Sequence, residues 1–252
     1  NMGQALAQGL LFTRAAQPGS IHASALRQDK LRASCARLGV TLGTNEEVAK
    51  ASDLIILAVK PWQMAEVIHQ IEKDLLGKPV ISVAAGISYA QLKNMLPASA
   101  RGLCCIPNTP VAVGKGILIC EEDHGFTQED LARFNSLFER VALIVFLDKT
   151  QMSAGSTIAG CGPAFAALFL EALGDAGVKY GVKRDMAYRL AARMLEGTAR
   201  LHLETGQHPG QMKDNVCSPG GTTIRGVSAL EENGFRHAII SAIDAVDGVK
   251  KG

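Results

Sequence analysis

The first 148 residues alternate between unbroken apolar runs and stretches with apolar residues at helical spacing. Runs of Val, Ile, Leu and Ala without polar interruption are typical of strands that are covered on both faces of a parallel sheet. Such runs predict strands at Ser20–Ser24, Asp53–Val59, Pro79–Ala84, Arg101–Ile106, Gly116–Cys120 and Val141–Leu147. Strands that alternate with helices predict right-handed crossovers. We therefore expect an α/β domain with a doubly wound parallel sheet at residues 1–148.

Helix signals lie between these strands. Arg27–Leu38 is predicted to be helical, and Pro61–Leu76 opens with a proline at a first-turn position, where its missing N–H costs nothing. Ser88 is followed three residues later by Gln91, which is the spacing of a capping box, and Thr127 is placed to begin a further helix.

From residue 149 onward the pattern is helical and no strand-like run appears. Ala164–Val178 is almost wholly apolar with many small residues, which predicts a buried helix. Asp185–Thr205 has apolar residues on one side and arginines on another, which predicts a long amphipathic helix. Further helices are predicted at Pro209–Val216, Thr222–Glu232 and Phe235–Val249. We expect an all-helical domain at residues 149–252 whose apolar surface meets a partner chain.

The composition excludes several classes of protein. A chain of 252 residues with 47% hydrophobic and 20% charged residues is neither disordered nor collagen-like. A net charge of +2 and 5% aromatic residues argue against nucleic acid. The apolar runs are too short to cross a bilayer and no leader pattern opens the chain, so we expect no membrane association and a cytoplasmic location. We expect the partner to be a small molecule.

The cysteines and histidines do not have the spacing along the chain that is typical of metal ligands. The six cysteines contain no CxxC pair, and the six histidines are scattered along the chain. The sequence therefore predicts reduced, mostly buried thiols and no metal site.

The start of the chain carries a weak dinucleotide signal. Gly3, before a helix predicted at Gln4–Leu10, matches only the last glycine of a possible GxGxxG turn, and chance alone would explain it. A doubly wound sheet has its first strand in the middle. We therefore expect residues before Asn1 to supply that strand and the two leading glycines.

Small or amide residues follow three successive predicted strands. Val59 and Lys60 end the first, Ala84-Ala85-Gly86 ends the next, and Asn108-Thr109-Pro110 follows the third. Ligands of open α/β sheets bind at the carboxyl ends of strands, so these ends predict one crevice lined by backbone. Three ordinary turns, with Lys60 a solvated lysine, are the simpler alternative.

The most informative stretch is KDNVCSPGGTTIRGVSAL, which spans residues 213–230. Consecutive N–H groups of Gly220, Gly221 and Thr222 at a helix start would form an anion site for a carboxylate or phosphate. A plain helix cap by Thr222 or Thr223 is the alternative. Two glycines and two hydroxyls exceed what a cap needs, so we favour a binding site.

The motifs SPGGTTI, DLIILAVKP, SVAAG, PNTP and the GPA of residues 162–164 resemble those of pyrroline-5-carboxylate reductase, the last enzyme of proline synthesis. The resemblance spans nearly the whole chain. It implies a Rossmann-like dinucleotide-binding domain, a helical dimerisation domain and an active site completed by the partner subunit. It also implies hydride transfer from NADPH or NADH to the C=N carbon of 1-pyrroline-5-carboxylate.

The resemblance also suggests site residues. The expected cofactor neighbours are Asn1, Met2, Gly3, Asn45, Ala58, Val59, Lys60 and Ala84, and the strand-end argument adds Asn108. The expected substrate-binding residues are Val216, Ser218, Gly220, Gly221 and Thr222, and Thr223 is the expected catalytic residue. Cys161 stands where many relatives have serine, and we interpret it as a tolerated small residue, not a nucleophile.

Two other functions are alternatives for this sequence. A two-domain 3-hydroxyacid dehydrogenase needs a lysine on a helix of its second domain, and Lys179, Lys183 and Lys213 are available, although none has a matching glycine-rich context. A non-catalytic dinucleotide-binding regulatory paralogue would need no carboxylate site, so the intact SPGGTT loop argues against it.

The sequence favours NADPH over NADH. NAD-specific folds place an acidic residue at the end of the second strand, where this chain has Ser24-Ala25-Leu26 and then Arg27, which is suited to a 2′-phosphate. Asp29 is expected inside the following helix.

Overall fold

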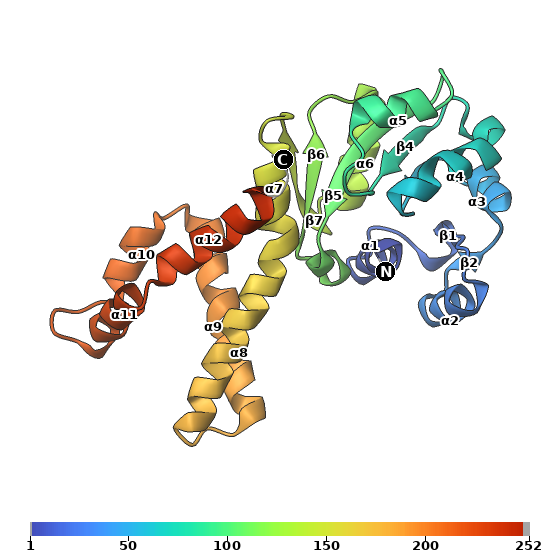
Figure 1. Ribbon diagram of the computed structural model, residues 1–252. Helices are drawn as coiled ribbons and strands as arrows, with labels where there is room; N and C mark the ends of the chain where they lie inside the picture. Colours follow the sequence, from blue (N-terminus) through green and yellow to red (C-terminus); the bar gives the residue numbers. More distant parts are fainter. Residues whose placement is uncertain (1, 249–252) are drawn as a thin grey trace. The chain divides into compact units, whose positions relative to one another are not determined.

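A computed structural model describes residues 2–248. The chain forms two compact units, residues 1–163 and 164–252 (Figure 1). The domain boundary expected after residue 148 stays a prediction. Two residues named above, Asn1 near the cofactor and Val249 at the end of the last helix, lie outside the described part of the chain.

The first unit is built on a five-stranded sheet of order β3-β4-β5-β6-β7. Its strands are β3 Ile55–Leu57, β4 Pro79–Ser82, β5 Arg101–Pro107, β6 Gly116–Glu121 and β7 Ala142–Leu147, and each falls on a predicted apolar run. A separate parallel pair joins β1 His22–Ala23 to β2 Thr41–Leu42. The two-residue β2 was not predicted, because so short a strand leaves no apolar run.

One strand pair departs from the expected parallel arrangement. β5 and β6 run antiparallel, with Cys105 opposite Cys120, whereas the other neighbours in the sheet are parallel. The connection holds only the short 3-10 helix η4, Thr109–Val113. A parallel crossover needs a dozen or more residues, so this short link forces the chain to turn straight back.

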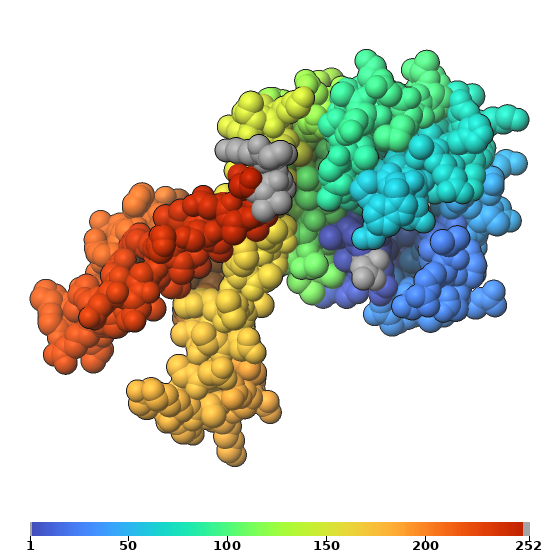
Figure 2. Space-filling model, in the orientation of Figure 1, coloured from blue at the N-terminus to red at the C-terminus, as the bar shows by residue number. Residues whose placement is uncertain are grey.

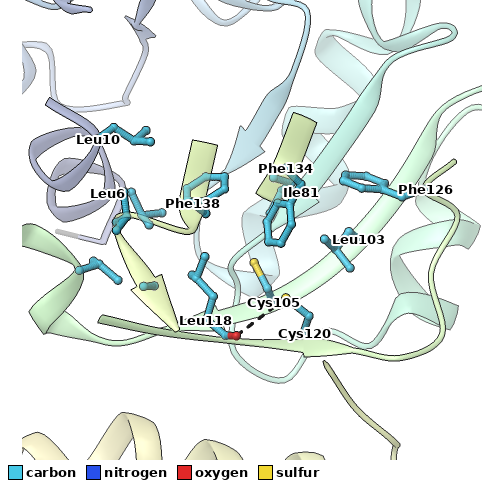
Figure 3. Packing of buried hydrophobic residues seen from close by; sticks show 13 residues of the cluster. Leu6, Leu10, Ile81, Leu103, Cys105, Leu118, Cys120, Phe126, Phe134 and Phe138 are labelled. Carbon is cyan, nitrogen blue, oxygen red and sulfur yellow. Dashed lines mark hydrogen bonds between the residues drawn. The ribbon is translucent and has the colours of Figure 1, made fainter. Parts of the chain in front are cut away.

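Both faces of the sheet are covered, as the unbroken apolar strands require. Along β4, Val80 packs on one face and Ile81 on the other, because side chains alternate along a strand. The Val80 face is covered by α3 Asn45–Ala51, α4 Met64–Gln70 and α5 Tyr89–Met95. The Ile81 face is covered by α1 Met2–Phe12 and α6 Gln128–Phe138, whose leucines and phenylalanines meet the strands in Figure 3. This layering confirms the doubly wound α/β fold.

The predicted helix starts are confirmed, and one helix is shorter than expected. Ser88 caps α5 with Gln91, and Thr127 caps α6 with Asp130, each in a complete capping box. Helix α2 spans Gln28–Leu38. The stretch predicted as one helix at Pro61–Leu76 is divided into η2 Pro61–Gln63, α4 and η3 Glu72–Leu75.

An ion pair fastens β5 to α6. Arg101 Nε lies 2.5 Å from Asp130 Oδ2, and a second guanidinium nitrogen lies 3.0 Å from Oδ1. The Asp130 side chain is only 8% exposed and also accepts the N–H of Thr127 at 2.9 Å. These bonds, above all those from Arg101, lower the pKa of Asp130 to about 2.

We expect Asp130→Asn to lower the free energy of unfolding at neutral pH by about 2–3 kcal/mol, because the half-buried Arg101 loses its carboxylate partner and keeps only the Gly77 carbonyl. The pKa of Asp130 is depressed on folding, so its contribution is present above the ordinary value near 4 and is lost as the pH falls towards 2. Urea denaturation between pH 7 and pH 2 measures this. The exposed Asp123→Asn is the control. If the difference in the free energy of unfolding between the parent and Asp130→Asn does not become smaller below about pH 4, the depressed pKa of Asp130 is contradicted.

The second unit consists of helices. They are α8 Gly162–Lys179, which begins in the first unit, α9 Arg184–Thr205, α10 Pro209–Asn215, α11 Thr222–Glu232 and α12 Phe235–Asp247. Helices α8 and α9 form a close antiparallel pair (Figure 1). A Cβ added to Gly174 of α8 would lie 2.2 Å from the ring of Tyr188 on α9, so this contact requires glycine.

The expectation that Ala164–Val178 is buried within the chain is wrong. Leu168 is 67% exposed, and among the described residues of this unit only Gly174, Ala187 and Ala191 are buried. In Figure 2 these helices, yellow to red, form narrow rods and not a rounded body. An apolar helix surface can be buried against a partner chain. In the single chain the apolar side chains of α8 therefore remain exposed.

The exposed apolar surface of α8 also concerns the expectation that the protein has no membrane association. The helical run Met152–Lys179 has 28 residues, a mean hydropathy of 1.4 over its most apolar stretch and 17% of that stretch buried. By length and composition alone it could cross a membrane, contrary to the expectation from the separate apolar runs. A helix that packs against a second protein chain has the same composition, so this is weak evidence for a span.

Candidate functional site

The carboxyl ends of β3 and β4 lie next to the start of α1. The N–H of Val83 donates to the carbonyl of Leu57 at 3.1 Å, which holds the two strand ends together. Met2 and Gly3 form the first turn of α1, and a Cβ added to Gly3 would lie 3.1 Å from Cβ of Ala58. Close helix–strand packing is the role of the last glycine in a dinucleotide-binding turn. The structure therefore brings Gly3 and Ala58 together as that role requires.

The other predicted residues of this edge differ in exposure. Ala58 and Lys60 are exposed, Val59 is half-buried and Ala84 is buried. Lys60 Nζ lies 6.0 Å from the ring centre of Trp62, which is itself exposed. The edge is thus lined by backbone and small side chains, with one lysine beside them.

The two predicted asparagines have different surroundings. Asn45 opens α3, and its Nδ2 donates to Gln70 Oε1 of α4 at 2.7 Å on the surface. Asn108 is buried at the end of β5, and its carboxamide is bonded on both sides, to Ile117 and to Ala159. The structure therefore keeps Asn108 inside the fold and does not turn it outward to the open edge.

The predicted substrate loop leads directly into α11 in the second unit. Gly220 has φ +69°, a left-handed conformation that favours glycine. The N–H of Gly221 donates to the carbonyl of Ser218 at 3.0 Å, and a Cβ on Gly221 would lie 2.5 Å from Ser218 Oγ. The two glycines are needed for different reasons, one for backbone conformation and one for space. Val216, at the end of α10, is exposed beside them.

The start of α11 is open to a ligand. Gly221 is the N-cap, and none of the described side chains caps this helix. The first N–H groups of a helix have no partner within it and attract anions. Thr222 and Thr223 are exposed on this first turn, so two hydroxyls stand beside the free N–H groups. Such a turn can hold a carboxylate and donate one further hydrogen bond.

Arg225 is a neighbour of the loop that the sequence interpretation did not select. Its guanidinium donates to the carbonyl of Gly220 at 3.2 Å. The signal was present, because Arg225 lies two residues after Thr223 on the same helix, but a surface arginine carries little information by itself.

The predicted residues form two groups in separate units. The residues from Met2 to Asn108 belong to the first unit and those from Val216 to Thr223 to the second. Cys161, the last residue of the π-helical turn η5, Thr157–Cys161, is half-buried. Of the lysines considered for a hydroxyacid dehydrogenase, Lys213 is paired with Asp214 at 2.7 Å, and Lys179 Nζ lies 5.7 Å from the ring centre of Tyr180.

Two family models match the chain. Residues 149–251 match the model of pyrroline-5-carboxylate reductase dimerisation, and residues 1–86 match that of NADP oxidoreductase, coenzyme F420-dependent. The match at 149–251 includes the whole loop from Val216 to Thr223.

Similar proteins agree over nearly the whole length. A pyrroline-5-carboxylate reductase from Treponema pallidum is 46% identical and covers 97% of this chain and 94% of its own. A crystal structure of the Plasmodium falciparum pyrroline carboxylate reductase with NADP bound is 30% identical, covers 99% of this chain and 93% of its own, and superposes with a TM-score of 0.84. The enzyme from Coxiella burnetii, 28% identical, covers 99% and 94% and gives a TM-score of 0.86. With this identity extending through both units, the chain belongs to the pyrroline-5-carboxylate reductase family.

Proposed function

We propose that this protein reduces 1-pyrroline-5-carboxylate to L-proline by hydride transfer from a reduced nicotinamide dinucleotide. The observation that carries the proposal is the glycine turn at Gly220 and Gly221, which leads into the uncapped first turn of α11. The substrate is small, with one carboxylate and one imine nitrogen, and that turn offers free N–H groups and two threonine hydroxyls. Family membership over both units supports the same reaction.

The chain's own residues have two tasks in this reaction. The N–H groups after Gly220 hold the carboxylate, and Thr223 Oγ1 donates a hydrogen bond to the imine nitrogen and helps to deliver its proton. When bound, the reduced nicotinamide supplies the hydride to the imine carbon. Most of the acceleration then comes from the alignment of two small reacting groups. A hydroxyl donor is sufficient here because the imine nitrogen is already basic.

The dinucleotide is assigned to the carboxyl edge of the first unit. The close approach of Gly3 to Ala58 fits the turn that such a cofactor needs, and the small residues at the ends of β3 and β4 leave its backbone accessible. Met2, Val59, Lys60, Ala84 and Asn45 complete the proposed cofactor-binding set, together with Asn1.

We expect NADPH to give a higher kcat/KM than NADH. Arg27 follows β1 and lies 3.6 Å from Asp29 in an exposed ion pair, which is weak enough for a 2′-phosphate to replace. Arg27→Ala should lower the preference for NADPH roughly tenfold, the effect of one charge-assisted hydrogen bond. Arg37→Ala, at the other end of α2, is the control. A higher kcat/KM for NADH in the parent protein would overturn this assignment.

The protein is further proposed to form a homodimer, or an assembly of dimers, through residues 149–252. The dimerisation family model and the exposed apolar face of α8 support this. We also propose a cytoplasmic location, supported by six cysteines that are all free in the structure.

The reaction is tested by following NADPH oxidation with 1-pyrroline-5-carboxylate as the varied substrate. We expect saturable turnover that yields proline, and no comparable oxidation of 3-hydroxy acids with NADP. Turnover of a 3-hydroxy acid alone would favour the dehydrogenase alternative. Binding of NADPH without turnover of either substrate would favour the regulatory paralogue.

A further inference from the structure

Asn108 directly follows β5, and its side chain accepts a hydrogen bond that the backbone carbonyl accepts in a regular strand pair. Its N–H donates to the carbonyl of Ile117 at 3.2 Å, as an antiparallel pair requires, but the N–H of Ile117 donates to Asn108 Oδ1 at 2.9 Å. In a regular pair the carbonyl of residue 108 would accept that bond. Here the carbonyl accepts the N–H of Val111 instead and so starts η4. The carboxamide therefore closes the strand pair and allows the chain to turn.

The other side of the carboxamide holds a helix that lies far away in the sequence. Asn108 Nδ2 donates to the carbonyl of Ala159 at 3.0 Å, and the two residues are 5% and 3% exposed. Ala159 lies within η5, the π-helical turn between α7 Met152–Ser156 and α8. One partner is a donor and the other an acceptor on opposite sides, which fixes the orientation of the amide.

Pro163 explains why Ala159 needs this bond. In a regular α-helix the carbonyl of residue 159 accepts the N–H of residue 163, four positions later. Pro163 has no N–H, and its ring would crowd that carbonyl. The wider π-turn leaves room for the ring, and Asn108 supplies the hydrogen bond that Pro163 cannot. A buried carbonyl without a partner would be costly.

We propose that Asn108 is a positioning residue for hydride transfer, acting by stabilising the π-turn η5 through its hydrogen bond to the Ala159 carbonyl, and not a contact of the cofactor. The turn is the last element before the second unit begins at residue 164, and α8 runs out of it. Because Pro163 prevents a regular helix here, loss of the Asn108 bond would loosen the turn, and the direction in which α8 leaves it would no longer be fixed. The proposal rests on the proposed function, in which one unit binds cofactor and the other substrate.

The kinetic signature follows from this mechanism. Each ligand would still meet its own binding residues, so the affinity for NADPH should not change. The alignment of the imine carbon with the nicotinamide would be lost, and small misplacements of that kind reduce kcat strongly. A direct contact with the cofactor would have the opposite signature, a weaker affinity for NADPH with kcat kept at saturation.

The test compares Asn108→Asp with the parent. Aspartate keeps the acceptor for Ile117 but replaces the donor to Ala159 by a charged oxygen. We expect kcat to fall at least tenfold, with the Kd for NADPH within about twofold of the parent. In hydrogen exchange, the amides of residues 157–162 and 164 should lose protection while that of Ile117 keeps it. Asn135→Asp, exposed on α6, is the matched control and should change neither.

Pro163→Ala provides a second route if Asn108→Asp does not fold. It restores an N–H at residue 163, so the helix can bond Ala159 itself and the π-turn can close. We expect a folded protein with at least a tenfold lower kcat and unchanged NADPH affinity.

The outcomes separate the inference from the proposed function. A parent protein that oxidises no NADPH with 1-pyrroline-5-carboxylate would refute the function, and hydrogen exchange would still decide whether Asn108 holds the π-turn. With an active parent, parental kcat in both variants would overturn the inference. So would an NADPH Kd raised at least tenfold by Asn108→Asp at unchanged kcat, because it would indicate a direct contact.

Discussion

Thr223→Val is expected to lower kcat for 1-pyrroline-5-carboxylate by roughly ten- to a hundredfold, the effect of losing one positioned proton-transfer partner. Valine keeps the shape of the side chain and removes its hydroxyl. Thr223 lies on the first turn of α11, two residues after Gly221. The carboxyl-bearing carbon of the substrate is bonded directly to the imine nitrogen. One short turn can therefore bind both the carboxylate and the imine nitrogen of the substrate.

The structure removes the simpler explanation for Thr223. The N-cap of α11 is Gly221, and no described side chain forms a capping hydrogen bond there, so Thr223 does not cap the helix. Loss of a cap would have cost about 1 kcal/mol of stability, which we therefore do not expect. The Kd for NADPH should also be unchanged, because the proposed cofactor residues lie in the other unit.

The control for Thr223→Val is Ser228→Ala, which removes a hydroxyl further along the same helix. Ser228 Oγ donates to the carbonyl of Ile224, away from the first turn. Ser228→Ala should retain the parental kcat. A folded Thr223→Val protein that turns over at the parental rate would show that Thr223 takes no part in the reaction.

Leu168→Glu is expected to dissociate the proposed homodimer and abolish activity at micromolar concentration. Leu168 is exposed on α8, in a unit whose few buried residues cannot form a core for a single chain. A homodimer contains the substituted position twice, so the loss should be roughly 3 kcal/mol or more, about a hundredfold in the dissociation constant. Sedimentation velocity, with activity measured at the same concentrations, checks this.

The control for this surface is Leu76→Glu. Leu76 is exposed to a similar degree but follows η3 in the first unit, away from the dimerisation match. Its substitution should leave the sedimentation coefficient unchanged. A parent protein that sediments as a folded monomer at micromolar concentration would refute the dimer and, with it, an active site completed by a partner subunit.

Elements with a local cause were predicted well from the sequence. The apolar runs from Asp53 to Leu147 became strands because both faces of the sheet are buried. The capping boxes at Ser88 and Thr127 start helices because each capping residue and its partner are three positions apart, so that each side chain reaches the backbone N–H of the other. The loop from Ser218 to Thr223 was recognisable because both glycines are required by its geometry.

Features with a distant cause could not be predicted from the sequence. Asn108 was assigned to the cofactor by its position at a strand end, but its side-chain partner Ala159 lies 51 residues away in the sequence. The π-turn at Thr157–Cys161 receives that bond, and Pro163 was a local sign of an irregular helix there. The burial of α8 was overestimated because its apolar pattern refers to a surface that one chain leaves exposed.

The central claim, reduction of 1-pyrroline-5-carboxylate to proline, is tested most directly by tracing the hydride. The protein is incubated with 1-pyrroline-5-carboxylate and NADPH deuterated at the transferred position of the nicotinamide, and the product is analysed by mass spectrometry and NMR. We expect L-proline with one deuterium on the ring carbon that was the imine carbon, and far less label with Thr223→Val in the same time. Absence of proline, or proline without deuterium at that carbon, would contradict the claim.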